Sequence, residues 1–183
     1  MIPFLVIATL VATVAAVTDL RSGHIPNRLT YGALSFGVGA HFARGAVCGD
    51  LSDGVTAGAL AVAGAAACGA VPLFMFSRGA MGGGDVKLFA AIGALLQPLG
   101  GLEAETYAFV AAALVAPAQL AWQGKLARTL AHTALLITNP LRKAEDRRPV
   151  PESMCAWFRL GPAVLVGMVA SLLVHGAPLV GSR

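Results

Sequence analysis

The chain has 183 residues, of which 57% are hydrophobic and only 12% are charged, and its mean hydropathy is +0.75. A soluble domain carries about a quarter charged residues, so this composition excludes an ordinary water-soluble domain and indicates a protein of the lipid bilayer. Disorder is also excluded, because it requires low hydrophobicity and high charge, and nucleic acid is not an expected partner. We therefore expect one all-α, polytopic integral-membrane domain over residues 1–183.

Six apolar segments predict six membrane-spanning helices, each of which needs about 20 mostly apolar residues. The first has no basic segment before it and runs directly into Asp19, which favours a retained helix over a cleaved signal peptide. The fourth is the shortest, because Lys87 stands at its start and Pro98 near its end. The predicted spans lie near 2–18, 29–47, 54–77, 86–100, 105–122 and 158–178.

The placement of Lys and Arg predicts the orientation of these spans, because short cytoplasmic loops are enriched in both residues. Eleven of the thirteen lie in or beside the loops after the first, third and fifth spans, and only Arg44 and Arg183 lie on the other side. We therefore expect both termini outside and three loops in the cytoplasm. The longest of these loops, 123–157, fits either an amphipathic helix on the inner leaflet or a basic tether.

Metal and cofactor sites are not expected. The three cysteines form no CxxC pair and are far apart in the chain. The four histidines show no spacing typical of metal ligands. The phosphate-binding patterns GxGxxG and GxxxxGK[ST] are both absent.

Two aspartates are the most informative residues of the sequence. Asp19 ends the first span and Asp85 stands at the entrance to the fourth, so both fall at the predicted cytoplasmic boundary. Ionisable groups at membrane depth are costly and usually face a cavity or a partner. Taken singly, each has a simpler explanation: Asp85 as the N-cap of the fourth span, and Asp19 as a solvated helix end paired with Arg21.

Taken together, the two carboxylates can perform hydrolysis. Two like charges held close cannot both ionise easily, so one carboxyl keeps its proton while the other is charged. The charged one takes a proton from a water that attacks a peptide carbonyl, and the protonated one donates to the carbonyl oxygen. Gly82, Gly83 and Gly84 precede Asp85 and, lacking Cβ atoms, allow an extended substrate backbone to approach. The alternative for these glycines is a flexible loop between helices.

Two segments of the chain together resemble the motifs of the prepilin peptidases, which are membrane aspartic proteases with a GxGD motif. The segments are Gly82-Gly83-Gly84-Asp85 followed by Val86-Lys87-Leu88, and Asp19-Leu20-Arg21 followed by Ile25-Pro26-Asn27. The segment 159–162 is similar, more weakly, to the start of the family's last helix. The resemblance implies that Asp19 and Asp85 are the catalytic pair. It also implies that an active-site or substrate-binding loop contains Gly82, Gly83, Gly84, Lys87, Pro26 and Asn27.

The function implied by this resemblance is removal of a short basic leader from type IV prepilins at the cytoplasmic face of the bacterial inner membrane. Because the chain lacks the paired CxxC motifs of the bifunctional members, it resembles the compact, peptidase-only type of Flp (tight-adherence) systems, and no methyltransferase activity is indicated. The implied partners are a prepilin and the bilayer, with the pilus assembly machinery as a further candidate, and neither a metal nor a cofactor is required.

Two other functions stay open at this point. One is a non-catalytic membrane subunit of a pilus or secretion assembly. The other is a small proton-coupled transporter, which is disfavoured because the middle of each span is almost entirely Ala, Val, Leu and Gly. The sequence leaves open which pilin is cleaved, at which residues, and in what oligomeric state.

Overall fold

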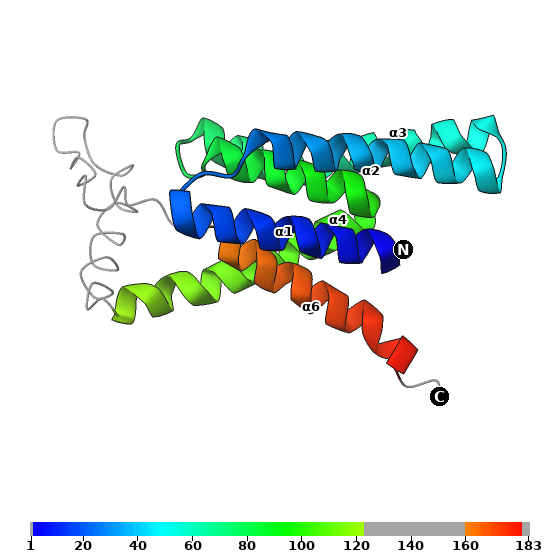
Figure 1. Cartoon of the computed structure of the whole chain (residues 1–183). Coiled ribbons are helices and arrows are strands. Elements are labelled where there is room, and N and C mark those ends of the chain that lie inside the picture. The colour runs from blue at the N-terminus through cyan, green and yellow to red at the C-terminus, as the bar shows by residue number, and fades with distance from the viewer. Residues whose placement is uncertain (1, 123–159, 181–183) are drawn as a thin grey trace, which may run out of the picture. The chain divides into compact units, whose positions relative to one another are not determined.

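The computed structural model describes residues 2–122 and 160–180, and the regular structure in these ranges is entirely α-helical (Figure 1). The chain divides into two compact units, residues 1–112 with 159–183 and residues 113–158. The contacts described below lie within the first unit. The predicted cytoplasmic loop 123–157 lies outside the described residues.

Helix α1 (Ile2–Ser22) carries a buried stripe that leads to Asp19. The stripe repeats every three or four residues, the period of one helix face, and consists of Phe4, Leu5, Ala8, Ala12, Ala15, Ala16 and Asp19. The helix ends at Gly23, whose positive φ of 68° suits a C-terminal cap and whose N–H donates to the Asp19 carbonyl at 2.9 Å. The sequence of α1 therefore turns Asp19 toward the protein interior.

Helix α6 (Gly161–Val180) lies along α1. The alanines of the α1 stripe are small, and small side chains allow helix backbones to approach closely in lipid. At the start of α6, a Cβ on Gly161 would lie 3.1 Å from the Ala16 Cα, closer than ordinary packing permits. The two helices therefore pack closely beside Asp19.

Helices α2 (Asn27–Cys48) and α3 (Leu51–Ser77) form a second pair that lies side by side (Figure 1). Pro26 precedes α2 in an extended conformation, and its carbonyl accepts the N–H groups of Leu29 and Thr30. Asp50 caps α3 by accepting the Asp53 N–H at 2.9 Å, and this hydrogen bond, with a second from the Ser52 hydroxyl, holds the pKa of Asp50 below its ordinary value.

Helix α4 (Gly83–Trp122) is broken at Gln97, whose backbone angles (φ 59°, ψ 177°) are not helical. Pro98 follows and disfavours a helical conformation in the residue before it. The buried His41 of α2 holds the break: its Nε2 lies 2.9 Å from the Leu95 carbonyl and its Nδ1 lies 3.3 Å from the Gln97 amide nitrogen. The His41 ring also stacks on Phe4 at a centroid distance of 4.0 Å.

The structure confirms the helical class over the described residues, but it does not confirm six spans. Within the described ranges, three helices are long and apolar enough to cross a membrane, at Ile2–Ser22, Leu51–Ser77 and Gly83–Ala118, and a shorter apolar helix covers Gly161–His175. The segment predicted at 29–47 forms helix α2, whose polar and charged residues, including Arg28 and Arg44, keep it out of this set.

The segments predicted at 86–100 and 105–122 both fall within α4. A straight helix of 36 residues would be about 54 Å long, well beyond a hydrocarbon core of about 30 Å. The break at Gln97 lies one residue before the predicted end-of-span turn that begins at Pro98. The orientation of the termini stays a prediction.

Candidate active site

Asp19 lies in the last turn of α1 and is buried, with 7% of its surface exposed. Its Oδ2 accepts a hydrogen bond from the Gly161 backbone N–H, at 3.2 Å, from the first residue of α6. The simpler explanation of a solvated helix end paired with Arg21 does not hold: among the described residues, the ion pair that the structure contains joins Glu103 and His175. Asp19 is therefore an interior carboxylate held by another helix.

Asp85 lies in the first turn of α4 and is partly buried. Its backbone N–H donates to the Gly82 carbonyl at 3.2 Å, which begins the helix. Its carboxylate and that of Asp19 are near enough for their charges to interact. The end of α1 and the starts of α2, α4 and α6 lie at one end of the first unit (Figure 1), and this arrangement brings the two aspartates together.

Two further contacts join the segments that follow and precede these aspartates. The Lys87 Nζ donates to the Asn27 Oδ1 at 3.0 Å and lies 5.2 Å from the centroid of the Tyr31 ring. The Ile25 side chain lies beside Gly84, where a Cβ would stand 3.4 Å from the Ile25 Cβ. Pro26, between them in sequence, is exposed. The structure thus brings together residues far apart in the chain that the resemblance assigned to one loop.

The glycines directly before Asp85 have ordinary helical backbone geometry. Gly83 and Gly84 form the first turn of α4, and the glycines of the described chain with positive φ are Gly23 and Gly79. A Cβ on Gly83 or Gly84 would meet the Phe76 or Ile25 side chain only at ordinary contact distances. The folded chain itself therefore does not require glycine at positions 83 and 84.

Two contributors to the site lay beyond the sequence analysis. Gly161 was noted only as part of a weak motif, and its contact with Asp19 joins residues 142 positions apart. Tyr31 stands one helical turn after Asn27, which is a weak signal that it shares a face with that residue. In the described part of the chain, no three His, Cys, Asp or Glu side chains converge as a metal site requires.

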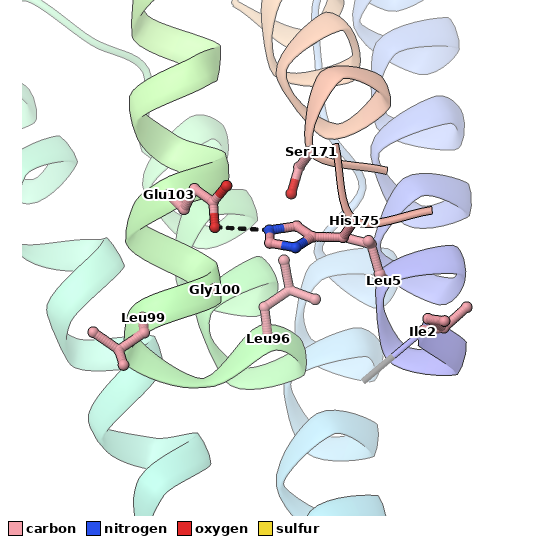
Figure 2. A pocket seen from close by; sticks show the side chains of 8 residues that line it. All are labelled: Ile2, Leu5, Leu96, Leu99, Gly100, Glu103, Ser171 and His175. Atoms are coloured by element: carbon pink, nitrogen blue, oxygen red, sulfur yellow. Dashed lines mark hydrogen bonds and ion pairs between the residues drawn. The ribbon is translucent and has the colours of Figure 1, made fainter. Parts of the chain in front are cut away.

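A pocket of about 390 Å³ lies elsewhere in the unit, where the first turns of α1 meet the region after the α4 break and the later turns of α6 (Figure 2). Its lining is mostly apolar, and the His175 Nε2 lies 2.9 Å from the Glu103 carboxylate within it. Neither aspartate lines this pocket: Asp19 lies at the other end of α1. We therefore do not assign the hydrolytic chemistry to it.

Glu105 is a second buried carboxylate of α4, with 4% of its surface exposed. Neither of its carboxylate oxygens has a well-formed hydrogen bond within the described residues. The neighbouring group that interacts with the carboxylate is the Cys68 thiol of α3. Glu105 is the first residue of the span predicted at 105–122, and its side chain is buried in the structure.

Comparison with known proteins identifies one family. A model of the type IV leader peptidase family matches residues 6–117, a range that contains Asp19, Asp85 and both segments around them and ends before Gly161. No curated protein and no solved structure matches the chain.

Proposed function

Because the chain belongs to the type IV leader peptidase family, we propose that it is an aspartic endopeptidase of the membrane that removes the basic leader from Flp-like type IV prepilins. In this proposal Asp19 and Asp85 activate the attacking water. The family and the apolar helices support a peptidase that is integral to the membrane. The aspartic mechanism, the Flp-like substrate and the cytoplasmic position of the site are our own extension.

The proposal rests on one observation: the two motif segments, residues 19–27 and 82–88, lie against each other in the folded chain. The charge of Asp19 interacts with that of Asp85, Ile25 lies beside Gly84, and Asn27 accepts a hydrogen bond from Lys87. These three links join residues 19–27 to residues 84–87, so the two segments pack against each other. A loop that merely joined two helices would not require this matched set of contacts.

The chemistry needs no group beyond the two carboxyls and a water. The water oxygen bonds to the carbonyl carbon while one of its protons passes to the ionised carboxylate, and the protonated carboxyl gives its proton to the carbonyl oxygen. The proton on the first carboxyl then passes to the amide nitrogen, the C–N bond breaks, and the second carboxylate takes back a proton from a diol hydroxyl. Both carboxyls return to their starting protonation states. The apparent pKa values of the two groups describe the pair and not either residue alone.

The substrate reaches this site from the membrane. A prepilin has an apolar helix that inserts beside the bundle, and its leader ends at the membrane surface, where Asp19 and Asp85 lie in the proposed orientation. A Cβ on Gly83 or Gly84 would only touch the Phe76 or Ile25 side chain at ordinary contact distances, so packing within the chain does not explain these glycines and we assign them to contact with the substrate backbone. In this proposal Lys87 and Asn27, which are hydrogen-bonded to each other, contact the peptide next to the cleavage point.

The test is cleavage of a Flp-like prepilin by membranes containing the full-length protein, with the new pilin N-terminus read by mass spectrometry. Asp19→Asn and Asp85→Asn should each abolish cleavage while the protein stays inserted. Asp53→Asn, at an exposed carboxylate of α3, and Arg44→Ala should cleave normally. Cleavage retained by either active-site variant would refute the assignment, and no cleavage by the wild type would favour a non-catalytic subunit.

A further inference from the structure

Helix α6 contributes to the site although it lies outside the range that matches the family. Its first residue, Gly161, donates its backbone N–H to the Asp19 Oδ2 at 3.2 Å. The backbone neighbour of the Asp85 carboxylate is local, because Gly82 lies only three residues before it. The Asp19 carboxylate, in contrast, is held by a backbone group 142 positions away in the chain.

We propose that Gly161 is a positioning residue for Asp19: its N–H fixes the orientation of the Asp19 carboxylate and stabilises the single negative charge that the pair must hold for hydrolysis. This inference rests on the proposed function. Gly161 contacts neither the water nor the peptide; it acts through Asp19. The helix that starts at Gly161 adds to the effect, since the N-terminus of a helix favours a nearby negative charge.

The absence of a side chain at position 161 makes this contact possible. A Cβ there would stand 3.0 Å from the Asp19 Oδ2, 3.1 Å from the Asp19 Cβ and 3.1 Å from the Ala16 Cα. Two of these atoms belong to the α1 backbone or lie next to it, so a flexible side chain cannot simply move away. A Cβ at position 161 therefore requires a shift between the start of α6 and Asp19, and we expect this shift to lengthen the hydrogen bond.

A donor to a carboxylate favours its charged form, so losing this donor has a defined effect on the pH profile. The acidic limb of kcat/KM reports the point at which the doubly protonated pair gives up its first proton. Weakening the Gly161 contact should move that limb to higher pH. The charged group that acts on Asp85 is Asp19; the cations nearest to the pair in the sequence are Arg21, two residues after Asp19, and Lys87, two residues after Asp85.

Three α6 variants of the full chain test the proposal with a prepilin substrate. Gly161→Ala keeps the N–H but displaces it, and Gly161→Pro removes it at a helix position where proline is tolerated. Gly167→Ala displaces α6 elsewhere, because its Cβ would stand 2.7 Å from the Ala108 Cα, far from Asp19. Gly39→Ala, whose Cβ would meet nothing within 4 Å, is the baseline. Insertion and thermal unfolding are measured for each variant.

We expect kcat/KM near neutral pH to fall about tenfold or more in Gly161→Ala and further in Gly161→Pro, the loss typical of a hydrogen bond to a charged group. The acidic limb should move to higher pH by about one unit in the same order. Gly167→Ala should lose activity or stability without this movement. An unmoved limb in both Gly161 variants, or an equal movement in Gly167→Ala, would overturn the proposal. Failure of the proposed function is distinguishable, because it appears as cleavage by Asp19→Asn or Asp85→Asn.

Discussion

At the level of single residues, the contacts of an added Cβ distinguish glycines that the fold requires from glycines that a substrate would require. A Cβ on Gly64 would overlap the Gly93 carbonyl oxygen and stand 2.8 Å from the Gln97 carbonyl carbon, both backbone atoms of α4. A Cβ on Gly84 would meet only the Ile25 side chain, at 3.4 Å. Helix packing explains why residue 64 is a glycine. It does not explain Gly84, which we assign to contact with the substrate.

This difference predicts the behaviour of two alanine variants. Gly84→Ala should unfold at the same temperature as the wild type yet cleave prepilin about tenfold more slowly, because the added methyl group occupies space intended for the peptide. Gly64→Ala should lose about 1–3 kcal/mol of stability through overpacking. Thermal unfolding in detergent and cleavage rates in membranes measure both effects. Wild-type cleavage by Gly84→Ala would show that no substrate backbone lies there.

At the scale of elements, α4 is the helix whose irregularity organises the bundle. Gln97 has a positive φ, which is strained for a residue with a side chain and persists only where the surroundings fix it. His41 supplies that fixation from α2: one ring nitrogen donates to the Leu95 carbonyl, and the other accepts from the Gln97 amide. Carbonyl groups freed at a helix break need such partners in a membrane protein.

The prediction for this element concerns stability. His41→Ala should lower the free energy of unfolding by about 2–4 kcal/mol, because it removes two hydrogen bonds and the stacking on Phe4 and leaves a cavity. His24→Ala is the matched control, since His24 is exposed and its hydrogen bonds are local. Unfolding by denaturant titration in micelles measures both. Equal stability of the two variants would contradict a role for His41 in holding the break.

At the level of the whole molecule, cleavage at the cytoplasmic face requires that the end of the first unit that holds the aspartates faces the cytoplasm. The loop between α3 and α4 lies at that end and contains Arg78, whereas the exposed Cys48 ends α2 at the opposite end. The positive-inside rule predicts the orientation from Lys and Arg. It says nothing about the thiol, so the thiol is an independent probe.

The orientation predicts the outcome of labelling intact cells whose outer barrier is permeable to a membrane-impermeant maleimide. A variant that keeps only Cys48 and Cys68 should react at Cys48, because Cys68 is buried. Moving the exposed thiol to the other end, with Cys48→Ser and Ala80→Cys, should abolish labelling until the inner membrane is disrupted. Labelling of Ala80→Cys in intact cells would invert the orientation and remove the site from the cytoplasmic face.

The sequence predicted the helical class and the pairing of the aspartates because both follow from short patterns. Apolar runs indicate helices, and alternate loops place Asp19 and Asp85 at the same boundary. The count of six spans stays a prediction, because two of the predicted spans lie within the broken helix α4 and α2 is not among the helices long and apolar enough to cross a membrane. The role of Gly161 was not predictable from pattern, since it depends on how closely α6 packs against Ala16 and Asp19.

The central claim is that Asp19 and Asp85 act on the same water as a unit. The most direct measurement is kcat/KM for prepilin cleavage by Asp19→Asn, Asp85→Asn and the double variant, with insertion confirmed for each. Residues that act as a unit are strongly non-additive, so we predict that the double variant is no slower than the slower single variant. Losses that add in free energy, or substantial cleavage by either single variant, would contradict a shared catalytic pair.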